Sequence, residues 1–236
     1  MYLLLFALGL AGIFIFFFVA VCLFERQPLC DFVPIPAGAV ATDSPYFNEM
    51  NAAAARLGFT PAGVFTQNRN SAIYQARGAV WISPERQILL YIAGGKTAKV
   101  PIKRTILISV LEPKNIFQTQ DEFGIADLSG LTHRKVILGA HMDELLASHR
   151  QRFAPNTGGL RMFSAAADLA DWKSVQAMKA QQLARLGLIK FLNSDQTVWR
   201  YTIKGSWLQF SKGLRGQLAE AEKQRERVHR KRPGAA

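Results

Sequence analysis

The sequence predicts an α+β protein that is anchored in a membrane by its N-terminus. Three observations predict this class. Residues 1–24 form an uncharged apolar run, residues 62–140 contain short β-branched and aromatic runs separated by Gly, Pro and Asn, and apolar residues recur at helical spacing on both sides of these runs. We therefore expect an N-terminal transmembrane helix, then an antiparallel β-sheet domain flanked by helices, and a C-terminal helical and β-hairpin appendage.

The apolar run is long enough to cross a bilayer as a helix. Residues 1–24 contain no Asp, Glu, Lys or Arg, and at about 1.5 Å per residue they span roughly 36 Å. Sixteen of them are Leu, Ile, Phe or Val, which favours insertion by about 5 to 10 kcal/mol. A cleaved signal peptide is the alternative, but the run lacks a positively charged start and a small-x-small cleavage site. A lipoprotein signal fits poorly, because Val21 precedes Cys22.

The charge distribution predicts which side of this cell membrane holds the soluble part. No Lys or Arg precedes the apolar run, whereas Arg26 and a strongly basic chain follow it, and the net charge is +12. The positive-inside bias therefore places the C-terminal bulk in the cytoplasm. The two cysteines, Cys22 and Cys30, lie in and just after the run. The fold is thus expected not to depend on disulfides, which favours a reducing compartment.

The segment that follows predicts a linker and then a helix. Residues 25–43 contain three prolines and no clean period, which is typical of an extended linker. Ser44-Pro45 is a helix start, because Ser can cap free amide groups and Pro suits the first helical position. Apolar residues from Phe47 to Leu57 then fall on one face. Residues 45–57 are predicted to be an amphipathic helix that packs on the sheet.

The predicted strands follow one another with short connections, at residues 62–67, 72–76, 78–83, 87–93, 100–111, 115–120 and 134–140. In residues 100–111, Ile and Val alternate with Lys103, Thr105 and Ser109, which predicts one buried face and one face in water. Short connections between sequential strands predict an antiparallel meander, with helices 45–57 and 142–153 covering its apolar face.

The C-terminal third predicts helices around one hairpin. Residues 161–186 contain no Gly or Pro and are predicted to form one long helix or two short ones, and 188–192 with 197–203 form a hairpin. The predicted segments are a transmembrane helix (1–24), a linker (25–43), an α+β domain (44–155), a helix plus hairpin (160–210), and a basic helix and tail (211–236).

Motifs that fix a reaction are not found in the sequence. Gly94-Gly95-Lys96-Thr97 lacks the upstream Gly of a phosphate-binding loop, because position 90 is Leu, and we interpret it as a turn between strands. Four side chains near the end of the predicted sheet were weighed as a metal or acid–base site: Asp121, Asp127, His133 and His141. The interpretation as loop carboxylates and surface imidazoles is preferred. We therefore predict no catalytic residue, no metal site and no cofactor.

One segment resembles a known module. Helical residues up to Leu186, the hairpin, and Trp199 to Gly205 resemble the recognition helix, wing and following turn of winged-helix proteins. The resemblance implies DNA phosphate contacts by Lys173, Lys179, Arg185, Lys190 and Arg200. A winged helix has three helices before the wing, whereas the stretch between Gly159 and Gly187 has room for two. The alternative, in which the hairpin pairs with the sheet edge or packs on its own helix, is preferred.

Basic residues accumulate toward the C-terminus and suggest an anionic partner. Residues 211–236 hold eight basic and three acidic side chains. The candidate contacts to an anionic surface are Lys190, Arg200, Lys212, Arg215, Lys223, Arg225, Arg227, Arg230, Lys231 and Arg232. A solvated tail without a partner is the other interpretation of the charged end.

Three functional hypotheses follow from these patterns. The leading hypothesis is a single-pass, signal-anchored membrane protein whose α+β domain binds or scaffolds a partner protein without catalysis, with anionic lipid headgroups as a second partner. A membrane-tethered nucleic-acid binder that uses residues 160–210 is the alternative. A membrane-anchored hydrolase is the third.

Overall fold

The computed structural model describes residues 23–29, 32–35, 44–67, 74–97, 100–122, 127–164 and 169–212, with a few single positions before residue 23. The predicted transmembrane helix at 1–24 lies almost wholly outside the described residues. Within the described part, no helix is both long enough and apolar enough to cross a membrane. Two compact units are formed, the larger by described residues of 29–124 and 130–179 and the smaller by those of 1–28, 127–129 and 180–212.

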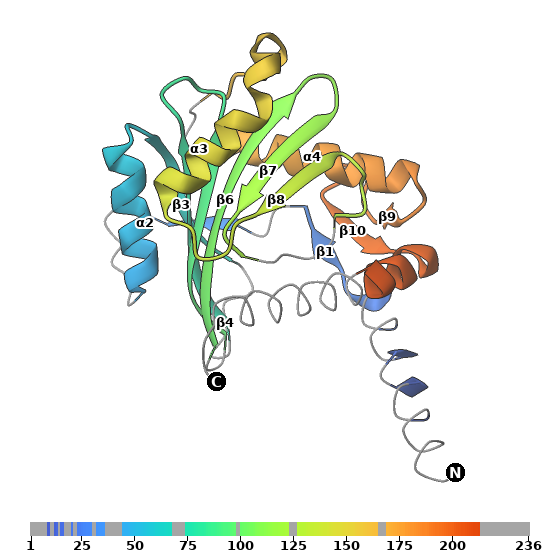
Figure 1. The fold of residues 1–236 in the computed structure, drawn as a ribbon. Helices are drawn as coiled ribbons and strands as arrows, with labels where there is room; N and C mark the ends of the chain where they lie inside the picture. The colour runs from blue at the N-terminus through green and yellow to red at the C-terminus, as the bar shows by residue number, and fades with distance from the viewer. Residues whose placement is uncertain are drawn as a thin grey trace, which may run out of the picture. The chain divides into compact units, whose positions relative to one another are not determined.

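The larger unit is built on a seven-stranded sheet in the order β2-β3-β4-β5-β6-β7-β8 (Figure 1). The strands are β2 (Phe32–Pro34), β3 (Thr60–Gln67), β4 (Tyr74–Ile82), β5 (Leu89–Thr97), β6 (Val100–Leu111), β7 (Asn115–Gln120) and β8 (Thr132–Val136). Neighbours from β2 to β7 pair antiparallel, as a meander predicts. The larger unit is therefore α+β.

The prediction of a wholly antiparallel sheet is wrong at its last strand. β8 pairs parallel to β7, with Ile116 opposite Thr132 and Gln120 opposite Val136. A parallel neighbour requires the chain to return along the length of β7, about 20 Å, before it pairs. Residues 121–131 are long enough for that return, and the Ile116 amide donates to the Leu131 carbonyl at 2.9 Å where the new strand begins. The sheet is mixed.

Two glycines that resemble turn signals instead lie inside strands. The strands predicted at 72–76 and 78–83 are one strand, β4, and a Cβ at Gly78 would collide with the ring of Phe65. The turn predicted at Gly94 is also wrong, because β5 continues through it to Thr97. A Cβ at Gly94 would lie 2.6 Å from Phe47 Cβ. Both glycines are required by close packing rather than by a chain reversal.

Residues of the predicted linker also enter the sheets. Phe32 of β2 stacks on Phe65 of β3 with ring centroids 3.8 Å apart, and Tyr91 of β5 stacks on Trp172 at 4.9 Å. These rings form one aromatic cluster, because Phe32 lies 5.7 Å from Trp172. Aromatic burial of this kind holds the short edge strand β2 in place, although its sequence carries no strand period of its own.

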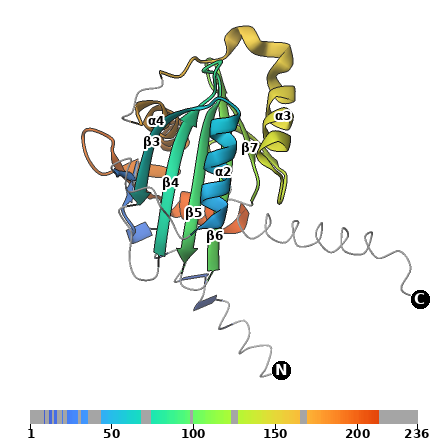
Figure 2. The ribbon, with the colours of Figure 1, turned by 90° about the vertical axis from the view of Figure 1, so that its left-hand side faces the viewer.

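Helices cover both faces of the seven-stranded sheet (Figure 2). Helices α2 (Pro45–Arg56) and α3 (Met142–Phe153), both predicted from the sequence, pack on one face, and residues 170–179 of α4 (Ala170–Arg185) pack on the other. Residues alternate between these faces along β5, where Leu90 joins the α2/α3 side and Leu89 joins the α4 side. The sheet is the middle layer of three.

The prediction of a wet face on residues 100–111 is therefore wrong over most of the strand. Thr105 and Ser109 of β6, which were expected in water, are fully buried on the α2/α3 side, and Leu107 between them is buried as well. The polar–apolar alternation correctly separates the two faces. It does not reveal that both faces are covered by helices.

The smaller unit contains a three-stranded antiparallel sheet in the order β1-β10-β9. Strand β9 (Ile189–Phe191) and strand β10 (Val198–Tyr201) form the predicted hairpin, and β1 (Gln27–Pro28) adds a third strand from the predicted linker. Residues 203–212 follow as a helix. The predicted one or two helices at 161–186 are a single helix, α4, within the described residues.

The burial of Phe47 predicts a large loss of stability on truncation. Phe47 is 1% exposed, in contact with the core between α2 and the sheet, so Phe47→Ala should lower the free energy of unfolding by about 3 to 5 kcal/mol. Urea unfolding of the detergent-solubilised protein, followed by circular dichroism, measures this. Glu49→Ala on the exposed face of the same helix should change it by less than about 0.5 kcal/mol. Equal effects would contradict the described packing.

Candidate functional site

The buried polar side chains of the larger unit are the first candidates for a site. Four of them lie on the α2/α3 face of the sheet, with Thr105 and Ser109 of β6 beside Thr119 and Asp121 at the end of β7. Burial of a polar group without a hydrogen-bond partner costs about 1 to 3 kcal/mol of stability. The partners of each buried polar group therefore indicate whether it serves the fold or is available to a ligand. These four residues belong to two separate hydrogen-bond networks.

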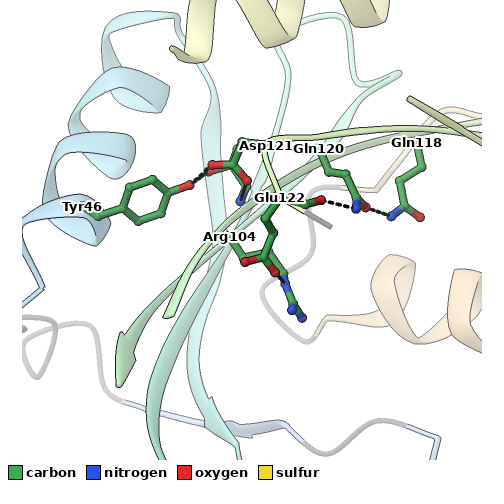
Figure 3. Close-up of polar contacts among 7 residues, drawn as sticks. Tyr46, Arg104, Gln118, Gln120, Asp121 and Glu122 are labelled. Atoms are coloured by element: carbon green, nitrogen blue, oxygen red, sulfur yellow. Dashed lines mark hydrogen bonds and ion pairs between the residues drawn. The ribbon is translucent and has the colours of Figure 1, made fainter. Parts of the chain in front are cut away.

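The first network joins helix α2 to the ends of β6 and β7. Tyr46, in the first turn of α2, donates its hydroxyl proton to Asp121 Oδ2 (Figure 3), and the Thr105 amide donates to Asp121 Oδ1 at 2.7 Å. Because the Tyr46 proton is used for the carboxylate, the Thr105 hydroxyl donates to the Tyr46 oxygen, 2.5 Å away. Both oxygens of Asp121 are therefore engaged by the protein itself.

The electrostatics of this network raise the pKa of both groups. Burial raises the pKa of Asp121, and the hydrogen bonds from Tyr46 and Thr105 oppose that rise. Burial and the nearby Asp121 carboxylate together raise the pKa of Tyr46, so the phenol stays protonated and acts as a donor. Asp121 is only 8% exposed. The arrangement is that of a structural clamp between α2 and the sheet, and not that of a carboxylate poised to meet a substrate.

An ion pair and a row of amides continue from the clamp (Figure 3). Arg104 of β6 pairs with Glu122, which directly follows Asp121. On the opposite, α4-facing side of β7, Gln118 donates to Gln120, and Gln120 donates to the Glu122 carbonyl. Lys179 of α4 reaches the Gln118 side chain at 3.3 Å. These groups tie the end of β7 to its neighbours on both faces.

The second network contains a serine and a histidine at hydrogen-bond distance. Ser109 Oγ lies 2.7 Å from the Gln87 carbonyl and 3.1 Å from His149 Nε2. The serine has one proton, and the carbonyl can only accept, so His149 Nε2 must carry a proton and donate it to Ser109. His149 Nδ1 then accepts from the Thr119 hydroxyl at 2.9 Å, whose oxygen accepts from Arg152 at 3.0 Å.

This direction of donation excludes the serine as an activated nucleophile. A general base must take the serine proton, whereas here His149 donates to Ser109. His149 is fully buried, and burial, reinforced by Arg152 and Arg150, lowers its pKa to about 3. The ring is therefore neutral at physiological pH. The pair packs α3 against β6 and β7.

The four residues weighed as a metal or acid–base site each have another partner or place. Asp121 is in the clamp, and Asp127 accepts from the Ser129 amide at 2.8 Å. His133 on β8 is opposite Phe117, four residues before Asp121, which separates them by about 13 Å along the sheet. His141 is the exposed residue before α3. Among the described residues, no group of three His, Cys, Asp or Glu side chains is arranged to hold a metal.

The smaller unit places two of the predicted anionic-surface contacts side by side. Lys190 of β9 is directly opposite Arg200 of β10, so both side chains leave the same face of the hairpin, and both are exposed. Like charges opposite one another in a sheet destabilise it. None of the carboxylates that the structure describes forms an ion pair with either. This pair of cations is the strongest candidate for an anion-binding surface.

Comparison of the chain with protein-family models, with curated proteins and with solved structures found no match.

Of the other predicted contacts to an anionic surface, Lys212 is exposed at the end of the described residues. The other predicted contacts lie outside them: Arg215, Lys223, Arg225, Arg227, Arg230, Lys231 and Arg232.

The segment that resembles a winged helix differs from that module where it is described. Between residues 160 and 189, the described residues contain one α-helix, α4, before the hairpin. Of the three α4 cations implied as phosphate contacts, Lys173 and Arg185 are exposed, but Lys179 donates to Gln118 of the sheet. Trp172 and Val175 of the same helix are buried in the core of the larger unit. The part of α4 that contains Trp172 and Val175 therefore packs in the core of the larger unit.

The residues of the two buried networks were missed because they are individually unremarkable in the sequence. Tyr46 lies in the first turn of a predicted helix. The sequence pattern places Thr105, Ser109 and Thr119 on the sides of strands that are expected to face water. One signal was available. His149 falls on the same face of helix 142–153 as Leu145, Leu146 and Phe153, and a histidine on an apolar face requires a buried partner.

Removal of the Tyr46 hydroxyl is expected to loosen the clamp. Tyr46→Phe leaves the Asp121 carboxylate without one donor and should cost about 1.5 to 3 kcal/mol in the free energy of unfolding at pH 7. In the wild type, the hydrogen bond from Tyr46 lowers the pKa of Asp121. Loss of this bond therefore raises the pKa of Asp121 further in the variant. The difference from the wild type should shrink at low pH, where the carboxyl is protonated in both. A difference that does not depend on pH would contradict the assigned hydrogen bond.

Neutral His149 predicts a loss of stability in mild acid. Its pKa is about 3 in the folded protein and ordinarily 6.5 for a histidine in water, so the unfolded chain takes the proton first. The contribution is complete above about pH 6.5 and decreases as the pH falls toward 3, by on the order of 1 kcal/mol per pH unit. Unfolding measured from pH 7 to pH 4.5 should show this slope. His149→Gln should flatten it, whereas His133→Gln, at an exposed position, should retain it.

Proposed function

We propose that this chain is a single-pass membrane-anchored protein whose α+β domain binds or scaffolds a partner without catalysis. The observation that carries the proposal is the commitment of its buried chemical groups to one another. Asp121 is engaged by Tyr46 and Thr105, and His149 donates to Ser109. Side chains that hold a fold in this way are not free to move protons on a substrate.

The membrane anchor in this proposal is residues 1–24. Its support is the uncharged sequence itself, which has the length and composition of a spanning helix. The proposed topology places the described units in the cytoplasm, since the basic residues all follow the apolar run. Anionic lipids of the inner leaflet are then close to the exposed Lys190 and Arg200.

A nucleic-acid binder tethered to the membrane is the second candidate function. The same pair of cations supports it, because Lys and Arg that release counterions from phosphates bind DNA or RNA with a steep dependence on salt. The protein in vesicles free of anionic lipid should then bind DNA, with an affinity that falls strongly between 50 and 200 mM salt and weakens in a Lys190→Gln, Arg200→Gln variant. Absence of binding at low salt would exclude this candidate. We do not propose the hydrolase further, since no observation supports it.

Topology is tested by labelling single cysteines in intact cells. In a Cys22→Ser, Cys30→Ser background, a cysteine introduced at the exposed position Glu49 should react with a membrane-impermeant reagent only after permeabilisation. The protein should also remain in the membrane fraction after alkaline extraction, because a spanning helix is not removed by loss of ionic contacts. Labelling of intact cells would reverse the topology, and release of a chain that begins near residue 30 would show a cleaved signal.

A further inference from the structure

The helix at residues 203–212 exposes two large apolar residues, whereas Leu208 and Phe210 are partly buried. Ile203 is 72% exposed and Trp207 is 53% exposed, and four residues apart they share one face. The face turned to the protein carries small and polar residues instead, with Ser206 fully buried and Gln209 8% exposed. A helix on the surface of a water-soluble domain has the reverse pattern.

This orientation of the helix is fixed by contacts that leave no room to rotate it. Thr202 caps the helix, since its hydroxyl oxygen accepts from the Gly205 amide at 3.1 Å, and it donates to the Gly187 carbonyl at 2.8 Å. Gly205 lies so close to Leu188 of the hairpin that an added Cβ would collide with the Leu188 carbonyl. The outward position of Ile203 and Trp207 is therefore built into the unit.

Chain length brings this unit to the end of the apolar run. Gln27 of β1 pairs with Trp199 of β10, and only Glu25 and Arg26 separate Gln27 from Phe24. Three residues of chain and one strand spacing place Trp199 within about 15 Å of Phe24. The helix begins two residues after β10 ends. If the run spans a bilayer, the hairpin and this helix lie at its surface.

The charge of the unit matches an anionic bilayer. Its described residues carry six basic and three acidic side chains, and Lys204 stands on the exposed side of the helix next to Ile203. Lys190 and Arg200 form the cationic pair on the hairpin. Trp at the level of the headgroups, flanked by Lys and Arg, is the composition of helices that lie in a membrane interface.

We propose that residues 203–212 form an interfacial helix that docks the smaller unit onto the anionic bilayer in which residues 1–24 are anchored. Ile203 and Trp207 enter the headgroup region, and Lys190, Arg200 and Lys204 contact the headgroups. The inference rests on the proposed anchor. A helix of this length binds lipid weakly alone, but the anchor holds it at a high effective concentration beside the surface. The smaller unit is thereby held in one orientation on the membrane.

The test uses the full-length protein with Cys22→Ser and Cys30→Ser, reconstituted into vesicles of phosphatidylcholine and phosphatidylserine. An environment-sensitive fluorophore on Ile203→Cys reports on the helix, and the same labelled protein in vesicles without spin-labelled lipid is the control. Spin-labelled lipids should quench the fluorophore at 203 several-fold relative to this control. The quenching should decrease in a Trp207→Ser variant. Quenching should be stronger in vesicles with phosphatidylserine than in pure phosphatidylcholine, and this increase should disappear in a Lys190→Gln, Arg200→Gln variant.

The outcomes separate this inference from the anchor on which it rests. Protein that does not float with the vesicles overturns the anchor and the docking together. Protein that floats, but shows no quenching at 203 beyond that in vesicles without spin-labelled lipid, overturns the docking alone. Self-quenching at 203 that rises with protein density, without quenching by lipid, assigns the apolar face to a second copy of the chain and also overturns it. Since Ile203 and Trp207 are exposed, circular dichroism should be unchanged in these variants.

Discussion

Burial of both faces of the central strands is the constraint on which the larger unit depends. Leu89 and Leu90, adjacent on β5, are both fully buried, because α4 covers one side of the sheet and α2 with α3 cover the other. A strand in this position has no water on either side. Each buried polar side chain on β6 and β7 must then find its hydrogen-bond partner within the protein.

That requirement explains the two buried networks. Thr105 and Asp121 are paired with Tyr46 from α2, and Ser109 and Thr119 are paired with His149 from α3. Each helix thus brings polar side chains to polar positions of the sheet. A shift of either helix by one turn leaves buried donors and acceptors unpaired, so the networks select the packing of the helices more than they add to its strength.

The smaller unit follows the opposite rule. Its hairpin holds Lys190 and Arg200 opposite one another, and its last helix exposes Ile203 and Trp207. Both features are unfavourable for a surface in water alone, because like charges repel and exposed apolar area remains hydrated. Both become favourable beside an anionic bilayer. The surface of this unit is where we propose binding, whereas the core of the larger unit stabilises the fold.

Local sequence determined the parts of the fold that local forces control. Ser44-Pro45 begins α2, residues 142–153 form α3, and the hairpin forms around Asn193 to Gln196, since capping, helical period and turn chemistry act within a few residues. The apolar run at 1–24 is likewise evident from composition. It remains a prediction, and so do the functions inferred from it.

Tertiary structure decided what contacts each face. Thr105 and Ser109 alternate with apolar residues as on a half-wet strand, and that side is dry because α2 and α3, which are distant in the sequence, pack on it. Gly78 and Gly94 resemble turns until Phe65 and Phe47 approach them. The parallel strand β8 and the short strands β1 and β2 have partners that no nearby residue specifies. The hydrophobic pattern of the sequence predicts whether a segment is a helix or a strand. Packing across the whole chain determines which segments lie beside it.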